Sequence, residues 1–118
     1  MGKVAMLVTN ACAPDPRVLR QARWLVQSGH DVTVHAFDRR QEHPPLDDVD
    51  GVSVVRHHLG QHTYGASFAT LRGLRQFRQS ALRACEETTP DLVVCHDADT
   101  LPLARRLRKV GIATVFDM

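Results

Sequence analysis

Short apolar runs alternate with amphipathic stretches along the whole chain. The runs predict about five strands, at residues 3–8, 31–37, 51–57, 91–95 and 112–116. Between them, apolar residues recur every three or four positions, which predicts three helices: one from Pro16, one after Ser67, and one from Thr100 to Val110. Strands that alternate with helices in this way are typical of an α/β fold with a doubly wound, Rossmann-like parallel sheet.

Local signals mark the ends of these helices. Asp15 is suited to cap the first helix, and Gly29 to end it in a left-handed conformation. Ser67 and Thr100 are expected to cap the second and third helices. The polar stretch 38–50, with two adjacent prolines, is expected to be a surface loop. The apolar stripe of the second helix consists of Phe68, Leu71, Leu74, Phe77, Ala81, Leu82 and Cys85.

The composition is that of an ordinary globular domain. The chain has 118 residues, of which 43% are hydrophobic and 24% are charged, and its formal net charge is +2. A single domain over residues 1–118 is therefore expected, and a strongly basic nucleic-acid binder is not. No apolar run near the start has the length of a signal peptide or a membrane span, so we expect a cytoplasmic protein. The cysteines, Cys12, Cys85 and Cys95, form no CxxC pair, which argues against a disulfide framework or a structural zinc site.

Candidate chemistry gathers after the ends of three predicted strands. Ligands of open parallel sheets bind beyond the carboxyl ends of the strands, which selects residues 9–15, 96–100 and 117–118. The dinucleotide motif GxGxxG does not follow the first strand, and the GxxxxGK motif of P-loops does not occur. We therefore do not expect a nucleotide phosphate at this end of the sheet.

The densest polar cluster is the turn of His96, Asp97 and Asp99, followed by Thr100. One interpretation is a cleft-lining site, in which the imidazole binds or polarises a substrate hydroxyl. A second is a metal site, which would need further ligands that the sequence does not specify. A third needs no ligand, because Asp97, Asp99 and Thr100 could cap the following helix.

Two further clusters allow more than one interpretation. His57, His58 and His62 could suggest a metal, but a solvated loop is the simpler expectation. The second helix carries Arg72, Arg75 and Arg78 along one side, beside its apolar stripe. This pattern predicts either peripheral contact with anionic lipid at the inner face of the membrane or a solvated basic face.

The sequence stops at Met118, directly after the apolar strand expected at 112–116. A complete doubly wound domain would normally continue with a helix that covers such a strand. We therefore expect a fragment of a longer protein, with an exposed edge strand that favours a homodimer.

Two stretches of the chain follow a recognisable pattern. The first contains Asp15-Pro16-Arg17-Val18, Ala22, Leu25 and the run from Gly29 to Val34. The second contains the run from Pro90 to Asp97, then Leu101-Pro102, and then Val115-Phe116-Asp117. In order and spacing they resemble the N-terminal domain of glycosyltransferase family 4, the retaining enzymes of GT-B fold. The similarity covers nearly all of the chain.

The resemblance implies a two-domain enzyme that moves a sugar from a nucleotide-sugar to a saccharide, lipid or small-molecule acceptor. Its N-terminal domain binds the acceptor, and its C-terminal domain, which this chain lacks, binds the nucleotide-sugar. Transfer retains the anomeric configuration and needs no metal or other cofactor. The isolated chain, as a truncated N-terminal half of the GT-B fold, is therefore expected to be inactive.

The resemblance also implies roles for individual positions. His96 would be the catalytic residue, and the acceptor-binding residues would be Asn10, Asp15, Arg17, Asp97, Asp99 and Thr100. The His-Glu pair that the family pattern places after Asp117 is missing, because Met118 follows instead. Two alternatives stay open: a stand-alone Rossmann-like binding or regulatory module, and a metal-dependent hydrolase that uses His96 and Asp97.

Overall fold

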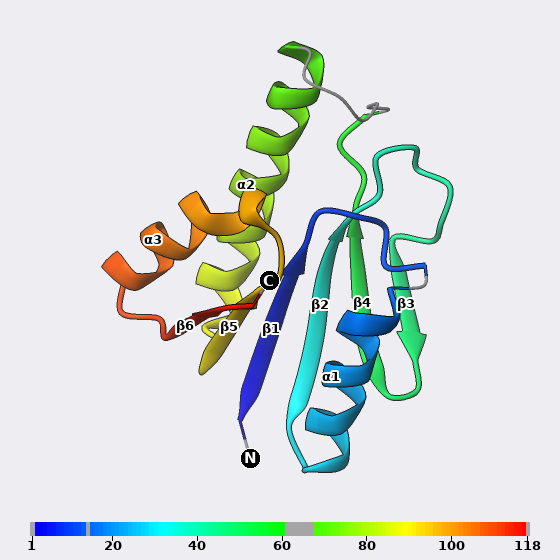
Figure 1. Cartoon of the computed structure of the whole chain (residues 1–118), viewed down its shortest axis with the longest axis vertical. Helices are drawn as coiled ribbons and strands as arrows, with labels where there is room; N and C mark the ends of the chain where they lie inside the picture. The colour runs from blue at the N-terminus through cyan, green and yellow to red at the C-terminus, as the bar shows by residue number, and fades with distance from the viewer. Residues whose placement is uncertain (1, 14, 61–67, 118) are drawn as a thin grey trace.

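The computed structural model describes residues 2–13, 15–60 and 68–117, with helices on both faces of one sheet (Figure 1). The strands lie in the order β3-β4-β2-β1-β5-β6. They are β1 (Lys3–Val8), β2 (Asp31–Phe37), β3 (Leu46–Val49), β4 (Val52–His57), β5 (Leu92–Cys95) and β6 (Thr114–Phe116). The helices are α1 (Pro16–Gln27), α2 (Phe68–Thr88) and α3 (Leu101–Lys109), with a short 3-10 helix, Ala98–Thr100, before α3. The predicted α/β fold is confirmed.

The strand β3 corrects the expectation that residues 38–50 form only a loop. It pairs antiparallel with β4, whereas the other neighbouring strands of the described residues pair in parallel. Asp50 and Gly51 connect the two strands with φ values of 54° and 85°, as a tight two-residue hairpin turn requires. This Asp-Gly pair is the sequence signal for the hairpin. Two consecutive aspartates in β3 obscured it, and they are tolerated because β3 is an exposed edge strand.

The ends of the helices follow the sequence signals in part. Asp15 Oδ1 accepts a hydrogen bond from Val18 N at 3.4 Å, and Gly29 has a φ of 93° after α1, so both predictions are confirmed. Thr100 does not cap α3 with its side chain: its hydroxyl donates to Asp97 O at 2.6 Å. The 3-10 turn before α3 holds Thr100 in a helical conformation, whereas a capping residue needs an extended one. Ser67 lies outside the described residues.

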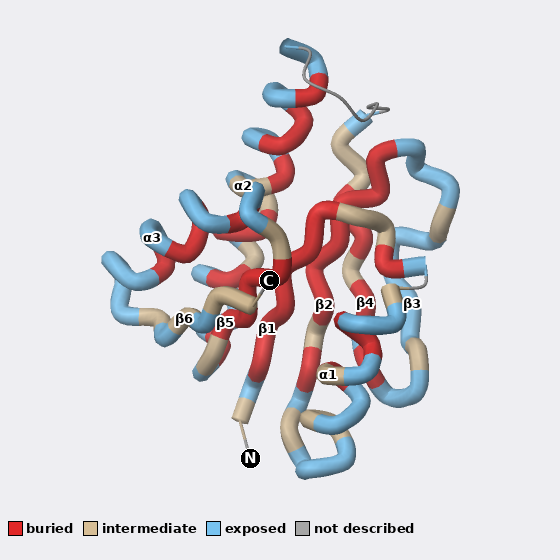
Figure 2. The backbone as a smooth tube through the Cα atoms, in the orientation of Figure 1, coloured by how far each residue is buried: buried red, intermediate tan, exposed pale blue. Residues whose placement is uncertain are grey.

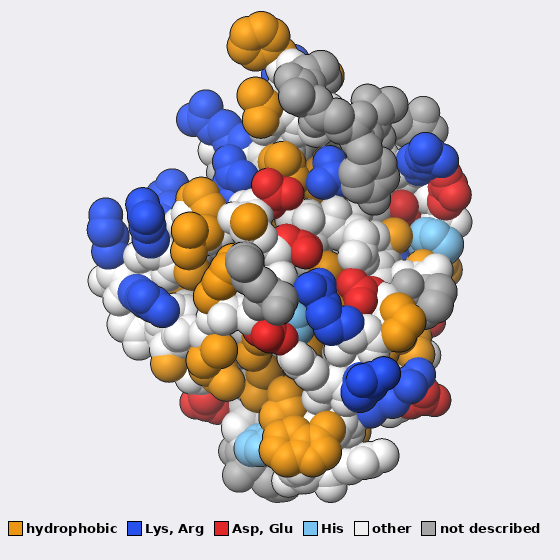
Figure 3. All heavy atoms as spheres, in the orientation of Figure 1, with side chains coloured by type: hydrophobic (Ala, Val, Ile, Leu, Met, Phe, Trp, Pro, Cys, Tyr) orange, Lys and Arg blue, Asp and Glu red, His pale blue; other side chains and the backbone are white. Residues whose placement is uncertain are grey.

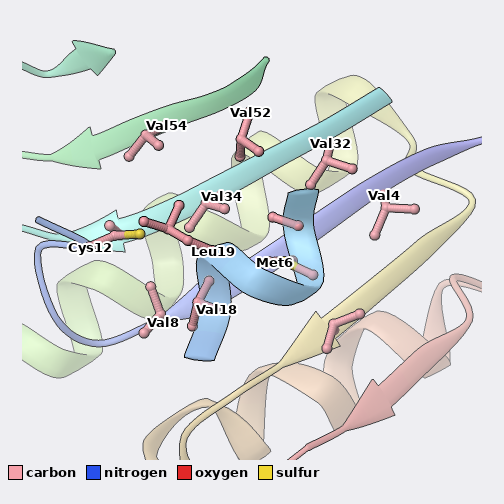
Figure 4. Packing of buried hydrophobic residues seen from close by; sticks show 13 residues of the cluster. Val4, Met6, Val8, Cys12, Val18, Leu19, Val32, Val34, Val52 and Val54 are labelled. Atoms are coloured by element: carbon pink, nitrogen blue, oxygen red, sulfur yellow. The ribbon is translucent and has the colours of Figure 1, made fainter. Parts of the chain in front are cut away.

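Two apolar clusters fill the two faces of the sheet. Figure 2 marks the buried segments in red, and Figure 4 shows the side chains of the cluster beneath α1. Along β1, Val4, Met6 and Val8 pack in the cluster beneath α1, whereas Ala5 and Leu7 pack in the cluster beneath α2 and α3. Because helices cover both faces, β1 is buried from its second residue onward, as expected of a parallel strand. The three cysteines are buried free thiols, and no described helix could span a membrane.

The apolar stripe of α2 is only partly buried. Its later positions lie in the cluster against the sheet, but Phe68 is 89% exposed and Leu71 is 55% exposed. The first turns of α2 extend past the end of the sheet (Figure 1), so these two side chains lie away from the core. The apolar stripe that the sequence shows is therefore buried only in its later positions.

A buried arginine joins the hairpin to the loop after β1. The guanidinium of Arg56 donates to Ala11 O at 2.7 Å and to Cys12 O at 3.1 Å. It also donates to Pro44 O at 3.2 Å and to Asp47 Oδ2 at 3.1 Å. One side chain of β4 thus holds two loops that are distant in the sequence, and it satisfies main-chain oxygens that neither loop pairs by itself.

Two buried histidines link β2, β4 and α2. His35 Nδ1 lies 3.0 Å from His57 Nε2, and His57 Nδ1 lies 2.6 Å from Ser80 Oγ. Burial lowers the pKa of each histidine to about 4, and the neighbouring His57 lowers that of His35 further. Both rings are therefore neutral near pH 7, and one proton lies between the two facing nitrogens.

We predict that Arg56→Ala lowers the free energy of unfolding by roughly 2–4 kcal/mol, because buried carbonyl oxygens lose their donor. Urea denaturation followed by circular dichroism measures the change. Arg40→Ala is the control, since its side chain is 69% exposed and 3.9 Å from Glu42, and it should shift stability by less than about 0.5 kcal/mol. Equal effects of the two substitutions would contradict the role given to Arg56.

We predict that stability falls as the pH drops from 6.5 towards 4. An unfolded histidine takes up its proton near pH 6.5, whereas folded His35 and His57 do so only near 4, so protons favour the unfolded chain in this window. A shift of this size corresponds to about 3 kcal/mol per histidine. Urea titrations at a series of pH values measure the slope, which His35→Gln or His57→Gln should flatten. His43→Gln changes a histidine of a loop and should keep the slope. A wild-type stability that does not change between pH 6.5 and 4 refutes the prediction.

Candidate functional site

Three segments meet at the carboxyl ends of the central strands (Figure 1). Residues 9–15 follow β1, the turn 96–100 follows β5, and Asp117 follows β6. The main chain joins two of them, because Asp117 N donates to Cys95 O at 2.8 Å. The first turn of α1 brings Arg17 to the same edge. The segments that the topology rule selected therefore lie together, apart from Met118, which is outside the described residues.

His96 is the buried centre of this site. Its residue is 1% exposed, and neither ring nitrogen has a hydrogen-bond partner among the described residues. The nearest carboxylate oxygen, Asp117 Oδ2, is 3.8 Å from Nδ1, which is too far for a hydrogen bond. An unpaired buried polar group costs about 1–3 kcal/mol, so the fold holds this imidazole at an energetic cost. At the ligand edge of a parallel sheet, a ligand hydroxyl could pair with one of these ring nitrogens.

The charge state of His96 follows from its surroundings. Burial lowers its pKa, and the positive charge of Arg17 lowers it further. The carboxylates of Asp117, Asp97 and Asp15 act in the opposite direction but do not outweigh burial. The ring is therefore neutral near pH 7, with one nitrogen able to donate a hydrogen bond and the other able to accept one.

Asp97 ties the turn after β5 to the end of β1. Its Oδ2 accepts hydrogen bonds from Thr9 N at 2.8 Å and from Thr9 Oγ1 at 3.0 Å. Its Oδ1 lies 3.6 Å from a guanidinium nitrogen of Arg17. The same nitrogen lies 3.8 Å from Asp15 Oδ2, so Arg17 stands between the two carboxylates. Asp97 makes no side-chain cap to the 3-10 helix, so the capping interpretation does not explain it.

Asn10 and Asp15 shape the loop that borders the site. Asn10 Nδ2 donates to Asp15 Oδ2 at 2.8 Å, while Asn10 Oδ1 accepts from Cys12 N at 2.8 Å. The hydrogen bond from Cys12 N closes a turn in which the backbone of Cys12 has a φ of 50°. This left-handed conformation is uncommon for a residue other than glycine. The side chain of Arg17 is 42% exposed between two aspartates, so it can meet a ligand from solvent.

Asp99 and Thr100 are not brought into the cluster around His96. Asp99 is exposed, and its main-chain oxygen accepts a hydrogen bond from Arg78 of α2 at 3.2 Å. Thr100 is completely buried, and its hydroxyl is used by Asp97 O inside the 3-10 turn. Their assignment as acceptor-binding residues stays a prediction that rests on the resemblance alone.

Sequence reasoning missed partners that support the site. Gln21 Nε2 donates to Asp117 Oδ2 at 2.6 Å and holds this carboxylate beside the His96 ring. Arg39 is buried and donates through Nε to Thr9 O at 3.3 Å, so it supports the end of β1. Gln21 stands four positions after Arg17, hence on the same side of α1, a signal that helical spacing offered. Arg39 follows β2 in a stretch expected to be loop and gave no such signal.

A metal site finds little support in this geometry. The described residues contain no group of three or more histidine, cysteine or acidic side chains placed to hold a metal ion. His57 contacts His35 and Ser80, whereas His58 Nε2 lies 3.0 Å from Asp38 Oδ2, so the two neighbours have separate partners. His62 lies outside the described residues. Figure 3 shows acidic and basic side chains next to one another near the centre of the molecular surface in this view.

Comparisons with solved structures agree with the fold. Sucrose-phosphate synthase from Thermosynechococcus elongatus superimposes with a TM-score of 0.77 at 14% identity, over 98% of this chain and 32% of that chain. The catalytic domain of starch synthase IV from Arabidopsis thaliana, bound to ADP and acarbose, superimposes with a TM-score of 0.70 at 15% identity, over 98% of this chain and 33% of that chain. The C-terminal domain of the PF1911 hydrogenase from Pyrococcus furiosus superimposes with a TM-score of 0.68 at 16% identity, over 99% of this chain and 92% of that chain.

These identities support a common fold and no more. The chain spans about a third of the length of the first two structures, and it matches the Rossmann-like domain expected of the GT-B fold. No curated protein matches the chain. A family model described as a glycosyl transferase 4-like domain, however, matches residues 13–118, which is most of the sequence. The chain therefore belongs to the glycosyl transferase 4-like domain family.

Proposed function

We propose that this chain is the acceptor-binding half of a retaining glycosyltransferase. The observation that carries the proposal is His96 at the carboxyl ends of the strands. It is a neutral, fully buried imidazole, and neither ring nitrogen is paired within the part of the chain that the structure describes. Membership of the glycosyl transferase 4-like family makes a sugar hydroxyl the fitting partner. The sugar would move from a nucleotide-sugar to a saccharide, lipid or small-molecule acceptor.

Within this proposal each polar group has a distinct task. His96 pairs one ring nitrogen with a sugar hydroxyl at the carboxyl ends of the strands. Asp117, held by Gln21, lies on the Nδ1 side of the ring and favours the tautomer with the proton on Nδ1, which leaves Nε2 as the acceptor. Arg17 and Asp97 flank His96 and bind the acceptor with Asn10 and Asp15. A contact from Asp99 and Thr100 to the acceptor is supported by the family resemblance alone.

The donor requires a second domain in this proposal. The loop after β1 contains prolines in place of the glycines that let a backbone approach a pyrophosphate closely. A nucleotide-sugar is therefore bound by a C-terminal domain, and these 118 residues alone do not transfer sugar. The share of the sucrose-phosphate synthase structure that the chain covers, 32%, is consistent with this division.

A stand-alone binding or regulatory module is the second candidate. The similarity to the C-terminal domain of the PF1911 hydrogenase favours it, because that solved domain is covered over 92% of its length by this chain. A domain of this size and fold thus exists outside long glycosyltransferase structures. The two candidates differ in whether a donor domain is needed for function.

Two contacts belong to the proposal as well, in a cytoplasmic protein that does not bind nucleic acid. Arg72, Arg75 and Arg78 would make peripheral contact with the anionic inner face of the membrane, supported by the exposed Phe68 one turn earlier. A homodimer would form through the edge strand β6, next to an apolar cleft of about 610 Å³ that Trp24 and Val115 line.

We predict that the 118-residue chain alone binds no UDP-sugar or GDP-sugar with micromolar affinity. Isothermal titration calorimetry measures this directly. The same titration on a protein in which this chain is joined to a nucleotide-sugar-binding domain should give binding, because the donor domain is then present. Micromolar binding by the short chain would contradict the division of labour.

We predict that His96→Gln weakens saccharide binding to the chain by about tenfold or more, because the unpaired imidazole supplies a hydrogen bond that the shorter amide misplaces. Titration of mono- and disaccharides, followed by nuclear magnetic resonance, measures it. His30→Gln, at the opposite edge of the sheet, is the matched control and should bind like the wild type. Because the pKa of His96 is lowered, binding should persist below pH 6.5 and weaken only in stronger acid. Unchanged affinity in His96→Gln removes the proposed role.

A further inference from the structure

A cleft between α2 and α3 lies outside the site around His96. It has a volume of about 230 Å³, and its lining includes Arg75, Arg78 and Gln79 of α2 with Pro102, Leu103 and Arg106 of α3. Three of these side chains carry a positive charge, and none of the lining residues is acidic. Figure 3 shows Lys and Arg side chains gathered over the side of the molecule that α2 and α3 form.

The three arginines have few partners of their own. Arg78 NH1 donates to Asp99 O at 3.2 Å, a main-chain contact that orients the side chain without neutralising it. Neither Arg75 nor Arg106 forms a hydrogen bond or an ion pair within the described residues. Like charges three positions apart on a helix destabilise it slightly. The pair Arg75 and Arg78 therefore destabilises α2 unless an anion binds between the two side chains.

Helix electrostatics explains only part of this arrangement. The last turn of α3 contains Arg106, Arg108 and Lys109, where cations favour the negative end of the helix dipole. Arg75 and Arg78 stand in the middle of α2, where the dipole offers no such stabilisation. Their convergence with Arg106 on one concave surface therefore needs another physical reason.

We propose that this cleft binds a phosphate group. Three guanidinium groups around a small concavity concentrate positive potential, and each can donate paired hydrogen bonds to phosphate oxygens. A tetrahedral phosphate directs its oxygens towards donors from two helices, whereas the oxygens of a carboxylate lie in one plane. The phosphate could come from a lipid headgroup or from a soluble phosphate compound. The cleft is separate from the His96 cluster, whereas a lipid source of the phosphate would rest on the membrane contact proposed above for Arg75 and Arg78.

The test compares two double variants that remove the same charge. Arg75→Gln/Arg106→Gln changes the cleft, whereas Arg83→Gln/Arg105→Gln changes exposed arginines of the same two helices outside it. Each protein is titrated with inorganic phosphate while the arginine and backbone resonances are followed by nuclear magnetic resonance. Each is also sedimented with vesicles of phosphatidylglycerol, and with phosphatidylcholine vesicles as a neutral control. All four altered side chains are exposed, so both variants should keep the wild-type circular dichroism spectrum.

The wild type should show saturable shifts confined to residues 75–79 and 102–106, and the cleft variant should bind about tenfold more weakly or worse. The control variant should keep wild-type affinity. Binding of inorganic phosphate without binding of phosphatidylglycerol vesicles identifies a soluble source. Binding of the vesicles that depends on the cleft, with or without binding of inorganic phosphate, identifies a headgroup. Binding of neither probe overturns the proposal, and so does an equal loss in both variants, because general charge attraction would then explain it.

Discussion

The buried guanidinium of Arg56 is the constraint on which the ligand edge of this domain depends. It stands on β4, yet it holds the carbonyl oxygens of Ala11 and Cys12 in the loop after β1. That loop turns sharply without glycine, and Cys12 adopts a left-handed conformation within it. Such a conformation persists only where the surroundings determine it, and the hydrogen bonds from Arg56 supply that determination. The position of α1, and with it Arg17, follows from the path of this loop.

A second set of contacts fixes the other wall of the site. Asp97 accepts hydrogen bonds from the main-chain N–H and the side-chain hydroxyl of Thr9, which joins the ends of the neighbouring strands β1 and β5. Gln21 holds Asp117 from the opposite side. His96 stands between these contacts and takes part in none of them through its ring. The rigidity of its neighbours is what keeps an unpaired imidazole in place, since a looser frame would let it rotate towards a partner.

The sequence predicted the order of the elements well and their edges less well. The apolar runs and helical periodicity located β1, β2, β4, β5, β6 and the three helices, because burial on both faces leaves a strong pattern in the residues. The short hairpin strand β3 was missed, since an exposed edge strand needs no apolar alternation. Phe68 and Leu71 belong to the apolar stripe of α2 but are exposed, because periodicity shows which side of a helix is apolar but not how far the helix extends past the sheet.

The sequence by itself determined the α/β fold, the family and the three segments that gather at the carboxyl edge of the sheet. The topology of a parallel sheet makes these follow from the order of strands and helices. Only the tertiary structure decided that Asp97 binds Thr9 in place of capping a helix, and that Thr100 is turned inward. It also revealed that the His96 ring has no hydrogen-bond partner among the described residues, and that Arg106 of α3 lines one cleft with Arg75 and Arg78 of α2. The reason is physical: hydrogen-bond partners and shared clefts arise between segments distant in the chain, where sequence spacing has no bearing on distance.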